Sequence, residues 1–365
     1  MNRKIYIDNL RSICILLLFP YHAAMAWNCW GEGNYILLEP NKWISSFVVA
    51  VSPWYMTLLF LLAGISTKYS LEKRSAKQYK KERSFKLLLP ALAGTLTVMP
   101  VLTYIADKTT YGYTGTFSEH YLIFFTKWTD LTGYDGGFGI GHLWFLLYLY
   151  IISILSSFLI EFQKKSFSKK CTLNLISSRK ISFKLNVPVI ILLCFMAMLL
   201  MPIELGGKSI LTYSFFYLLG YYVFAEEKNI ESLTRLKYPF FMIFIISTYF
   251  NVYLFLWSAS QYKTINTTAK YFSGVFGILS FIIFGKEHLE KSNKKTKYFA
   301  SQSFLIYIFH FPWVVLFQFF FRQIIANSFI LLTVSVLCSF AATLATGQII
   351  KQIPAVQYFF GKKPR

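Results

Sequence analysis

The chain has 365 residues, of which 55% are hydrophobic and only 15% are charged. An ordinary soluble domain carries about 25% charged residues, so this composition excludes a soluble globular enzyme, whose surface needs more polar groups. The formal net charge of +21 occurs together with long apolar runs, and we therefore expect the basic residues to flank membrane spans rather than to bind nucleic acid.

Ten apolar runs approach the length of about 20 residues that a membrane-spanning helix needs. The sequence therefore predicts an all-α integral membrane protein, a polytopic bundle of about ten transmembrane helices. In chain order, the predicted spans are 10–30, 44–67, 87–106, 142–162, 187–204, 209–226, 239–258, 270–285, 302–322 and 328–350. We expect residues 1–350 to form one transmembrane domain and residues 351–365 to form a short basic cytoplasmic tail.

The distribution of Lys and Arg predicts the orientation of these spans. With a cytoplasmic N-terminus, 30 of the 37 basic residues lie on the cytoplasmic side and seven lie on the outer side. This asymmetry is typical of loops beside transmembrane helices. We therefore expect both termini in the cytoplasm and a multi-pass protein of a cell membrane, such as the bacterial plasma membrane. Membrane lipids are then its surroundings, and its apolar faces leave a homo-oligomer open.

Two connections between spans have a distinctive composition. The cytoplasmic connection 68–86 carries eight Lys and Arg, as expected of a loop that lies against anionic lipid headgroups. The outer connection 107–141 is rich in Tyr, Thr and Gly, which suits either sugar binding or an ordinary exposed loop. His120 and His288 lie in connections and indicate no function.

The five cysteines indicate neither a disulfide framework nor a metal site. They show no paired spacing such as CxxC, and three of them, Cys14, Cys194 and Cys338, lie inside apolar runs. We interpret the cysteines as small core residues and expect no metal ion.

The first span carries ionisable residues, which are costly inside a membrane. His22 follows Arg11 by 11 residues, close to three helical turns, so the two side chains share a face and lie about 16 Å apart along the axis. Asp8 precedes Arg11 by one turn on nearly the same face. Two interpretations are open. His22 is a core histidine and Arg11 an ordinary membrane anchor, or the stripe is a binding site with Arg11 on phosphates and His22 as an acid–base group.

Further polar residues can join this stripe. His142 opens the fourth predicted span, and His310 lies near the middle of the ninth, at a depth comparable to that of His22, so these histidines can face one cavity or be structural. Arg83 and Lys86 precede the third span and share a helix face. Two cations on one face suit a diphosphate, or they are simply basic residues at the membrane surface.

Together these motifs resemble the acyltransferase 3 family of integral membrane acyltransferases. The run from Tyr6 to Arg11 followed by His22 is similar to the family's opening, which has a basic residue, ten intervening residues and a histidine. Arg83 and Lys86 are similar to its paired basic residues before a proline, although Lys86 stands where Arg is more usual. Residues 142–146 resemble the fourth-helix motif, and residues 307–310 resemble a late-helix motif that ends in histidine. The opening Asp-Asn-Leu-Arg looks most like the glucan biosynthesis protein C branch.

The resemblance implies transfer of an acetyl or succinyl group from cytoplasmic acyl-CoA (acetyl-CoA or succinyl-CoA) to a hydroxyl of an extracytoplasmic glycan. It implies that His22 is the catalytic residue, either as an acid–base group or as a transient acyl carrier. The implied phosphate-binding residues are Arg11, Arg83 and Lys86, supported by Asp8 and Asn9. The implied acceptor-binding residues are His142, Trp144, Tyr307 and His310.

One alternative is a transporter or flippase of a polysaccharide or lipid-linked precursor, with the histidines as a proton relay. Such a protein is expected to show internal repeats or paired broken helices, and the sequence shows neither.

Overall fold

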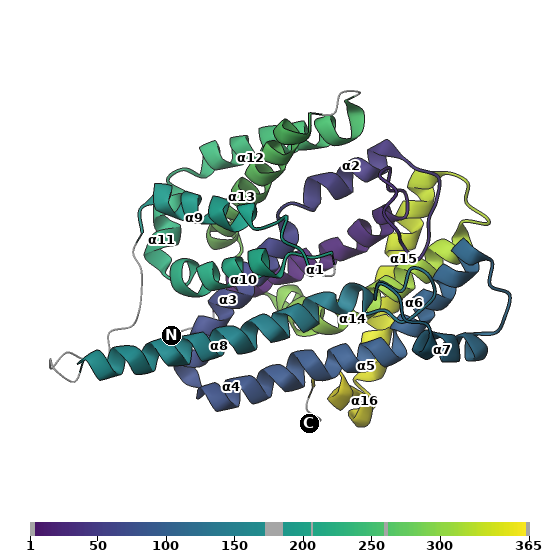
Figure 1. The fold of residues 1–365 in the computed structure, drawn as a ribbon, viewed down its shortest axis with the longest axis horizontal. Helices are drawn as coiled ribbons and strands as arrows, with labels where there is room; N and C mark the ends of the chain where they lie inside the picture. The colour runs from purple at the N-terminus through teal and green to yellow at the C-terminus, as the bar shows by residue number, and fades with distance from the viewer. Residues whose placement is uncertain (1–3, 172–184, 206, 259–261, 363–365) are drawn as a thin grey trace.

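In the computed structural model, the described residues are 4–171, 185–205, 207–258 and 262–362, with side chains described up to residue 166 in the first of these ranges. Within them the regular secondary structure is helical (Figure 1), apart from one β-bridge between Leu205 and Lys208. The predicted all-α fold is therefore confirmed.

The helices of the first half of the chain are α1 (Ile5–Met25), α2 (Lys42–Val51), α3 (Tyr55–Lys73), α4 (Ala76–Arg83), α5 (Leu89–Thr97), α6 (Met99–Ala106), α7 (Phe117–Thr126) and α8 (Trp144–Cys171). They include the predicted spans and two further helices, α4 and α7, that lie in predicted connections. A π-helical turn, η1 (Ser84–Leu88), joins α4 to α5, and a second, η2 (Asp107–Tyr111), extends α6. A short 3-10 turn, η3 (Gly141–Leu143), leads into α8.

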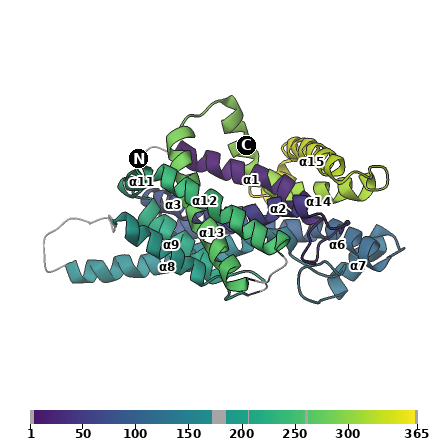
Figure 2. The same ribbon diagram turned by 90° about the horizontal axis from the view of Figure 1, so that it is seen from above.

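The second half of the chain is also built of helices, two of which are extended by π-helical turns. Its helices are α9 (Val187–Leu199), α10 (Ile210–Leu219), α11 (Glu227–Thr234), α12 (Lys237–Val252), α13 (Lys263–His288), α14 (Lys294–Phe321), α15 (Ser328–Ile350) and α16 (Pro354–Phe359). The π-helical turns η4 (Gly220–Phe224) and η5 (Tyr253–Trp257) extend α10 and α12. Seen from above, α7 lies at one end of the long axis and the far end of α8 at the other (Figure 2).

Seven helical segments in the described ranges are long and apolar enough to cross a membrane. They are Lys42–Lys73, Ala76–Tyr111, Gly141–Ser166, Lys237–Trp257, Lys263–His288, Lys294–Phe321 and Ser328–Ile350. Two shorter apolar helices, Val187–Leu199 and Ile210–Phe224, overlap the fifth and sixth predicted spans. The chain is thus a polytopic helical bundle, while the count of ten spans and the cytoplasmic position of the termini stay predictions.

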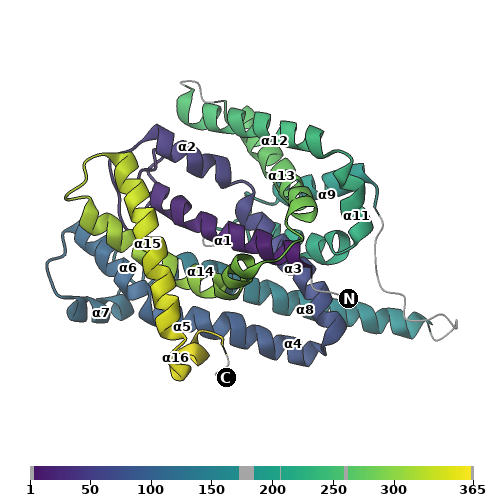
Figure 3. The same ribbon diagram turned by 180° about the vertical axis from the view of Figure 1, so that it is seen from behind.

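The helix α1 is long enough to span a membrane, but its polar residues reduce its hydropathy. It packs against α14, α15, α2, α13 and α3 (Figures 1 and 3), which cover most of it, although Ile13 is 48% exposed. Because other helices cover α1, its polar side chains are able to face an interior site.

Two details differ from the predicted spans. The second span, 44–67, is divided into α2 and α3, because Pro53 lacks the amide hydrogen that a continuous helix needs. The predicted loop 68–86 was wrong, because α3 continues to Lys73 and α4 begins at Ala76. The Ser75 side chain caps α4 by accepting from the amide of Gln78 at 3.2 Å, and Tyr79 buries that helix against its neighbours.

The helix α3 approaches α10 and η4 so closely that only glycine fits at the crossing. A Cβ atom at Gly64 would lie 1.9 Å from the carbonyl oxygen of Tyr217, and one at Gly220 would lie 2.1 Å from the carbonyl oxygen of Leu61. Small residues allow such backbone contact between membrane helices. The crossing places Thr67 beside Tyr217, whose hydroxyl lies 2.7 Å from that of Thr67.

Candidate active site

A cavity of about 710 Å³ lies among α1, α3, α4, the turn η1, α8, α14 and the C-terminal segment. Its basic lining residues come from the start of α1, the end of α3, the junction of α4 with η1 and the C-terminal segment, whereas α8 and the inner part of α14 contribute apolar and aromatic residues. On α1 the lining changes from Lys4 through Arg11 to Ile15, and on α14 it changes from Ala300 to Tyr307. The cavity therefore has an electropositive mouth and an apolar inner end.

Arg11 is held at the mouth by contacts on two sides. Its Nη1 donates to Oδ1 of Asp8 at 3.2 Å, and its Nη2 donates to Oγ of Ser66 on α3 at 2.7 Å. Both Asp8 and Arg11 line the cavity, as the predicted stripe requires. The planar guanidinium is thereby fixed in direction at the cavity surface.

Asn9 supports the site from the opposite face of α1. Its Nδ2 donates to the carbonyl oxygens of Leu289 at 2.7 Å and of Lys291 at 3.1 Å. These bonds tie α1 to the connection between α13 and α14, so Asn9 positions the helix rather than lining the cavity.

Arg83 and Lys86 both line the cavity, on either side of the start of the π-helical turn η1. The Nη2 of Arg83 donates to Oγ1 of Thr67 at 3.0 Å, and its guanidinium lies 4.9 Å from the ring centre of Tyr79. The Lys86 side chain is 59% exposed and lies 3.9 Å from Glu82. Arg83 is therefore a fixed cation and Lys86 a more accessible one.

Three histidines from different parts of the chain form a cluster beyond the inner end of the cavity. The ring centres of His22 and His310 lie 5.2 Å apart, those of His142 and His310 5.4 Å, and those of His22 and His142 6.5 Å. Phe311 stacks on the His22 ring at 4.1 Å. His22 is half-buried, whereas His142 and His310 are buried. The structure thus brings together the three histidines that the sequence singled out.

The hydrogen bonds of the two buried histidines define their tautomers. Nε2 of His142 lies 3.0 Å from the carbonyl oxygen of Ile308, and Nδ1 of His310 lies 2.7 Å from that of Tyr307. A carbonyl oxygen only accepts, so each of these nitrogens carries a hydrogen. Nδ1 of His142 and Nε2 of His310 are then bare acceptors, and both are buried without a partner within the described ranges. Hydroxyl groups are suitable donors to such nitrogens.

Tyr307 connects the cavity to the histidine cluster. It lines the cavity, and its hydroxyl donates to the backbone carbonyl of His142. Its ring centre lies 5.5 Å from that of Phe145 and 5.8 Å from that of His142. A molecule in the cavity would therefore reach the cluster past Tyr307.

The structure does not bring Trp144 to this cluster. Its ring packs against Tyr148 and Tyr213, each at 5.4 Å between ring centres, and Lys208 lies 5.6 Å over it. Trp144 follows His142 by two residues, which is about 200° around a helix, so the two side chains point to different sides.

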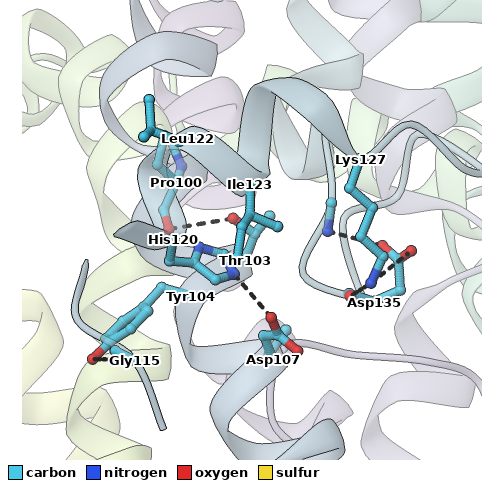
Figure 4. A network of polar contacts seen from close by, with 12 residues as sticks. Pro100, Thr103, Tyr104, Asp107, Gly115, His120, Leu122, Ile123, Lys127 and Asp135 are labelled. Atoms are coloured by element: carbon cyan, nitrogen blue, oxygen red, sulfur yellow. Dashed lines mark hydrogen bonds and ion pairs between the residues drawn. The ribbon is translucent and has the colours of Figure 1, made fainter. Parts of the chain in front are cut away.

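Sequence reasoning gave no role to His120, which the structure places in a buried polar network (Figure 4). Its Nε2 lies 3.2 Å from Oδ2 of Asp107, between the rings of Tyr104 and Tyr113. Burial lowers the pKa of His120, and the Asp107 carboxylate partly opposes this shift. No local pattern pairs these residues, because α7 must fold back on α6 to bring them together.

The same network also contacts the loop that precedes His142. Gly136, with φ of 85°, sits so close to Asp107 that a Cβ atom would lie 2.7 Å from the Asp107 Cβ. Lys127 and Asp135 pair at 3.5 Å across this loop (Figure 4). The loop leads directly into Gly141 and His142, so the network helps to place the start of α8.

Across the described part of the chain, no three His, Cys, Asp or Glu side chains converge as metal ligands would. The described cysteines are free thiols, and Cys14 and Cys194 are buried.

A helical membrane bundle whose cavity leads from fixed cations to clustered imidazoles has the parts of a membrane-embedded group-transfer enzyme. The family model of acyltransferase 3, described as an acyltransferase domain, matches residues 4–349. The chain belongs to this family, and it is a multi-pass bacterial membrane O-acyltransferase. The resemblance seen in the sequence is thereby confirmed.

The relatives agree with the branch that the first-helix motif indicated. Glucans biosynthesis protein C of Salmonella heidelberg is 22% identical over 99% of this chain and 95% of its own length. The protein of the same name from Salmonella typhi has the same identity and coverage. No solved structure matches the chain.

Proposed function

We propose that the protein transfers an acetyl or succinyl group from cytoplasmic acyl-CoA to a hydroxyl of an extracytoplasmic glycan. The observation that carries this proposal is a cavity that begins at Arg11, Arg83 and Lys86 and ends at Tyr307. The Tyr307 ring lies next to His142 and His310, and the His310 ring in turn lies 5.2 Å from that of His22. Acyl-CoA has the matching shape, with phosphates at one end and a thioester at the end of a long, thin arm.

The mouth of the cavity binds the phosphates of the donor. Arg11 and Arg83 are held in place by Ser66 and Thr67 of α3, so they are already oriented when a phosphate arrives. Lys86 adds a mobile charge that needs no fixed geometry. The pantetheine arm then runs along α1, whose rise from Arg11 to His22 is about 16 Å.

The transfer step uses His22 as a general base or as an acyl carrier. In the first route its imidazole takes the proton of the acceptor hydroxyl while that oxygen attacks the thioester carbonyl, and the CoA thiolate leaves. In the second route the imidazole nitrogen attacks the thioester carbonyl and the CoA thiolate leaves. The acceptor hydroxyl then attacks the acyl-histidine, which breaks the acyl–nitrogen bond, and the released imidazole takes the hydroxyl proton. Both routes need the acceptor hydroxyl next to His22.

The acceptor is positioned by His142 and His310. Their bare nitrogens accept hydrogen bonds from sugar hydroxyls, and Tyr307 fixes the backbone at His142. The name of the relatives refers to glucan biosynthesis, which supports a glycan as the acceptor. Trp144 holds α8 against Phe60 and Tyr213.

The test is acyl transfer in proteoliposomes that contain the purified protein. Labelled acetyl-CoA and succinyl-CoA are supplied separately on the side of the cavity mouth, with a mixed glycan pool on the other. Label that appears in carbohydrate, with release of CoA, supports the proposal and names the donor. Intact protein that neither binds CoA nor releases it from either thioester contradicts it.

A further inference from the structure

The C-terminal segment, predicted as a cytoplasmic tail, folds back onto the mouth of the cavity. The helix α16 contacts both α15 and α5 (Figure 3). Phe360 is 6% exposed and its ring centre lies 5.0 Å from that of Phe309, while Tyr358 lies 5.0 Å from Phe85. The segment is therefore docked by aromatic contacts on two helices.

Gly361 sets the position of the residue that follows it. It has φ of 72°, a left-handed conformation that favours glycine. A Cβ atom there would lie 3.1 Å from Pro90 Cγ, 3.2 Å from the carbonyl oxygen of Phe85 and 3.3 Å from Lys86 Cα. The backbone of the segment thus sits directly on the π-helical turn η1, and the Lys362 amide closes the turn by donating to the carbonyl of Gln357 at 2.9 Å.

This turn puts Lys362 into the lining of the same cavity. Lys362 is half-buried, and its burial together with nearby Lys351 lowers its pKa. The cavity lining is strongly unbalanced in charge within the described residues. Its basic members are Lys4, Arg11, Lys73, Arg74, Arg83, Lys86 and Lys362, and its acidic members are Asp8 and Glu82. A half-buried ammonium in such surroundings is stabilised by an anionic ligand.

We infer that Lys362 is a further donor-binding residue, which the docked C-terminal segment places at the cavity mouth to contact a phosphate group of the acyl donor. The inference rests on the proposed function and deepens it. Gly361, which precedes Lys362, packs against Lys86, so Lys362 lies at the mouth of the cavity. Tyr307 lies at the opposite, inner end. Lys362 therefore acts on the phosphate-bearing end of the donor and leaves the thioester and the transfer step unchanged.

The experiment compares Lys362→Ala with wild type, using acyl-CoA and an acyl-pantetheine that lacks the nucleotide phosphates. We expect KM for acyl-CoA to rise by about five- to tenfold, as for a lost charge-assisted bond, with kcat unchanged. KM for acyl-pantetheine should stay the same. Lys362→Arg, which keeps the charge, should restore most of the affinity.

The matched control is Lys351→Ala, because Lys351 lies 5.6 Å over the Tyr298 ring and is not in the cavity lining. Equilibrium binding of labelled CoA is measured on all variants, so that the result does not depend on turnover. A second variant, Gly361→Val, displaces the segment and should weaken CoA binding as Lys362→Ala does.

Wild type that binds and uses acyl-CoA, with Lys362→Ala equal to it in KM and CoA affinity, overturns this inference and leaves the proposed function standing. An equal loss in Lys351→Ala also overturns it, because general surface charge then explains the effect. Wild type that binds no CoA overturns the proposed function itself.

Discussion

At the scale of single residues, the site depends on side chains whose direction is set by a neighbour. The buried nitrogens of His142 and His310 are bare because carbonyl groups hold the hydrogens on the opposite sides of the rings. Arg11 is similarly directed by Asp8 and Ser66. An additional hydrogen-bond partner of this kind holds a polar side chain of a membrane helix in one orientation.

Arg11→Ala should raise KM for acyl-CoA by about tenfold, because a charge-assisted bond to phosphate is lost. Arg11→Lys should be intermediate, since an ammonium cannot contact Asp8, Ser66 and a phosphate as a planar guanidinium does. Steady-state kinetics in proteoliposomes measures both variants. An unchanged KM in Arg11→Ala would remove Arg11 from the donor site.

At the scale of elements, helix contacts that are remote from the chemistry support the cavity wall. The helix α3 supplies Ser66 and Thr67 to the two arginines, and it holds this position through the backbone contact of Gly64 with Tyr217. A change at the crossing should therefore affect folding and donor affinity together.

Gly64→Ala should destabilise the protein by about 1–3 kcal/mol or more, because the added methyl overlaps a backbone carbonyl that cannot move aside. The matched control is Gly347→Ala on α15, where a Cβ atom would meet nothing nearer than 3.7 Å. Thermal unfolding in detergent distinguishes the two. Equal midpoints for both variants would contradict the close crossing of α3 and α10.

The network of α6 and α7 should make stability depend on pH. Burial lowers the pKa of His120 in the folded protein, so the unfolded chain binds the proton more readily, and stability falls as pH drops below about 6.5. His120→Gln keeps a donor to Asp107 but cannot titrate. The thermal midpoint of wild type should therefore fall more than that of His120→Gln between pH 7.5 and pH 5. Parallel curves would show that His120 does not contribute.

At the scale of the whole molecule, the sequence predicts those features that depend on local patterns. Apolar runs identify the membrane helices, and the spacing of Arg11 and His22 predicts that the two residues share a face of α1, because both follow from helical periodicity. Two features are harder to predict from the sequence: the π-helical turn at Ser84–Leu88 and the division of span 44–67. Both depend on how prolines are accommodated between packed helices.

Features that need distant contacts were missed. The docking of Phe360 against Phe309 turns the expected tail into part of the cavity wall, and the pairing of His120 with Asp107 depends on how α7 folds back on α6. Trp144 illustrates the opposite case, because the motif identified the residue but not its packing against Tyr148 and Tyr213. Its role in acceptor binding stays a prediction. A motif identifies a residue, whereas the packing around it decides what that residue can contact.

The decisive measurement for the role of His22 is the rate of acyl transfer from labelled acyl-CoA to glycan in His22→Ala. The matched control is His288→Ala, whose side chain is 60% exposed at the end of α13. We predict that His22→Ala folds and binds CoA as wild type does but loses transfer by about 100-fold or more, as expected for removal of an acid–base or acyl-carrying group, while His288→Ala keeps full activity. Full transfer by His22→Ala would contradict the central role of this histidine.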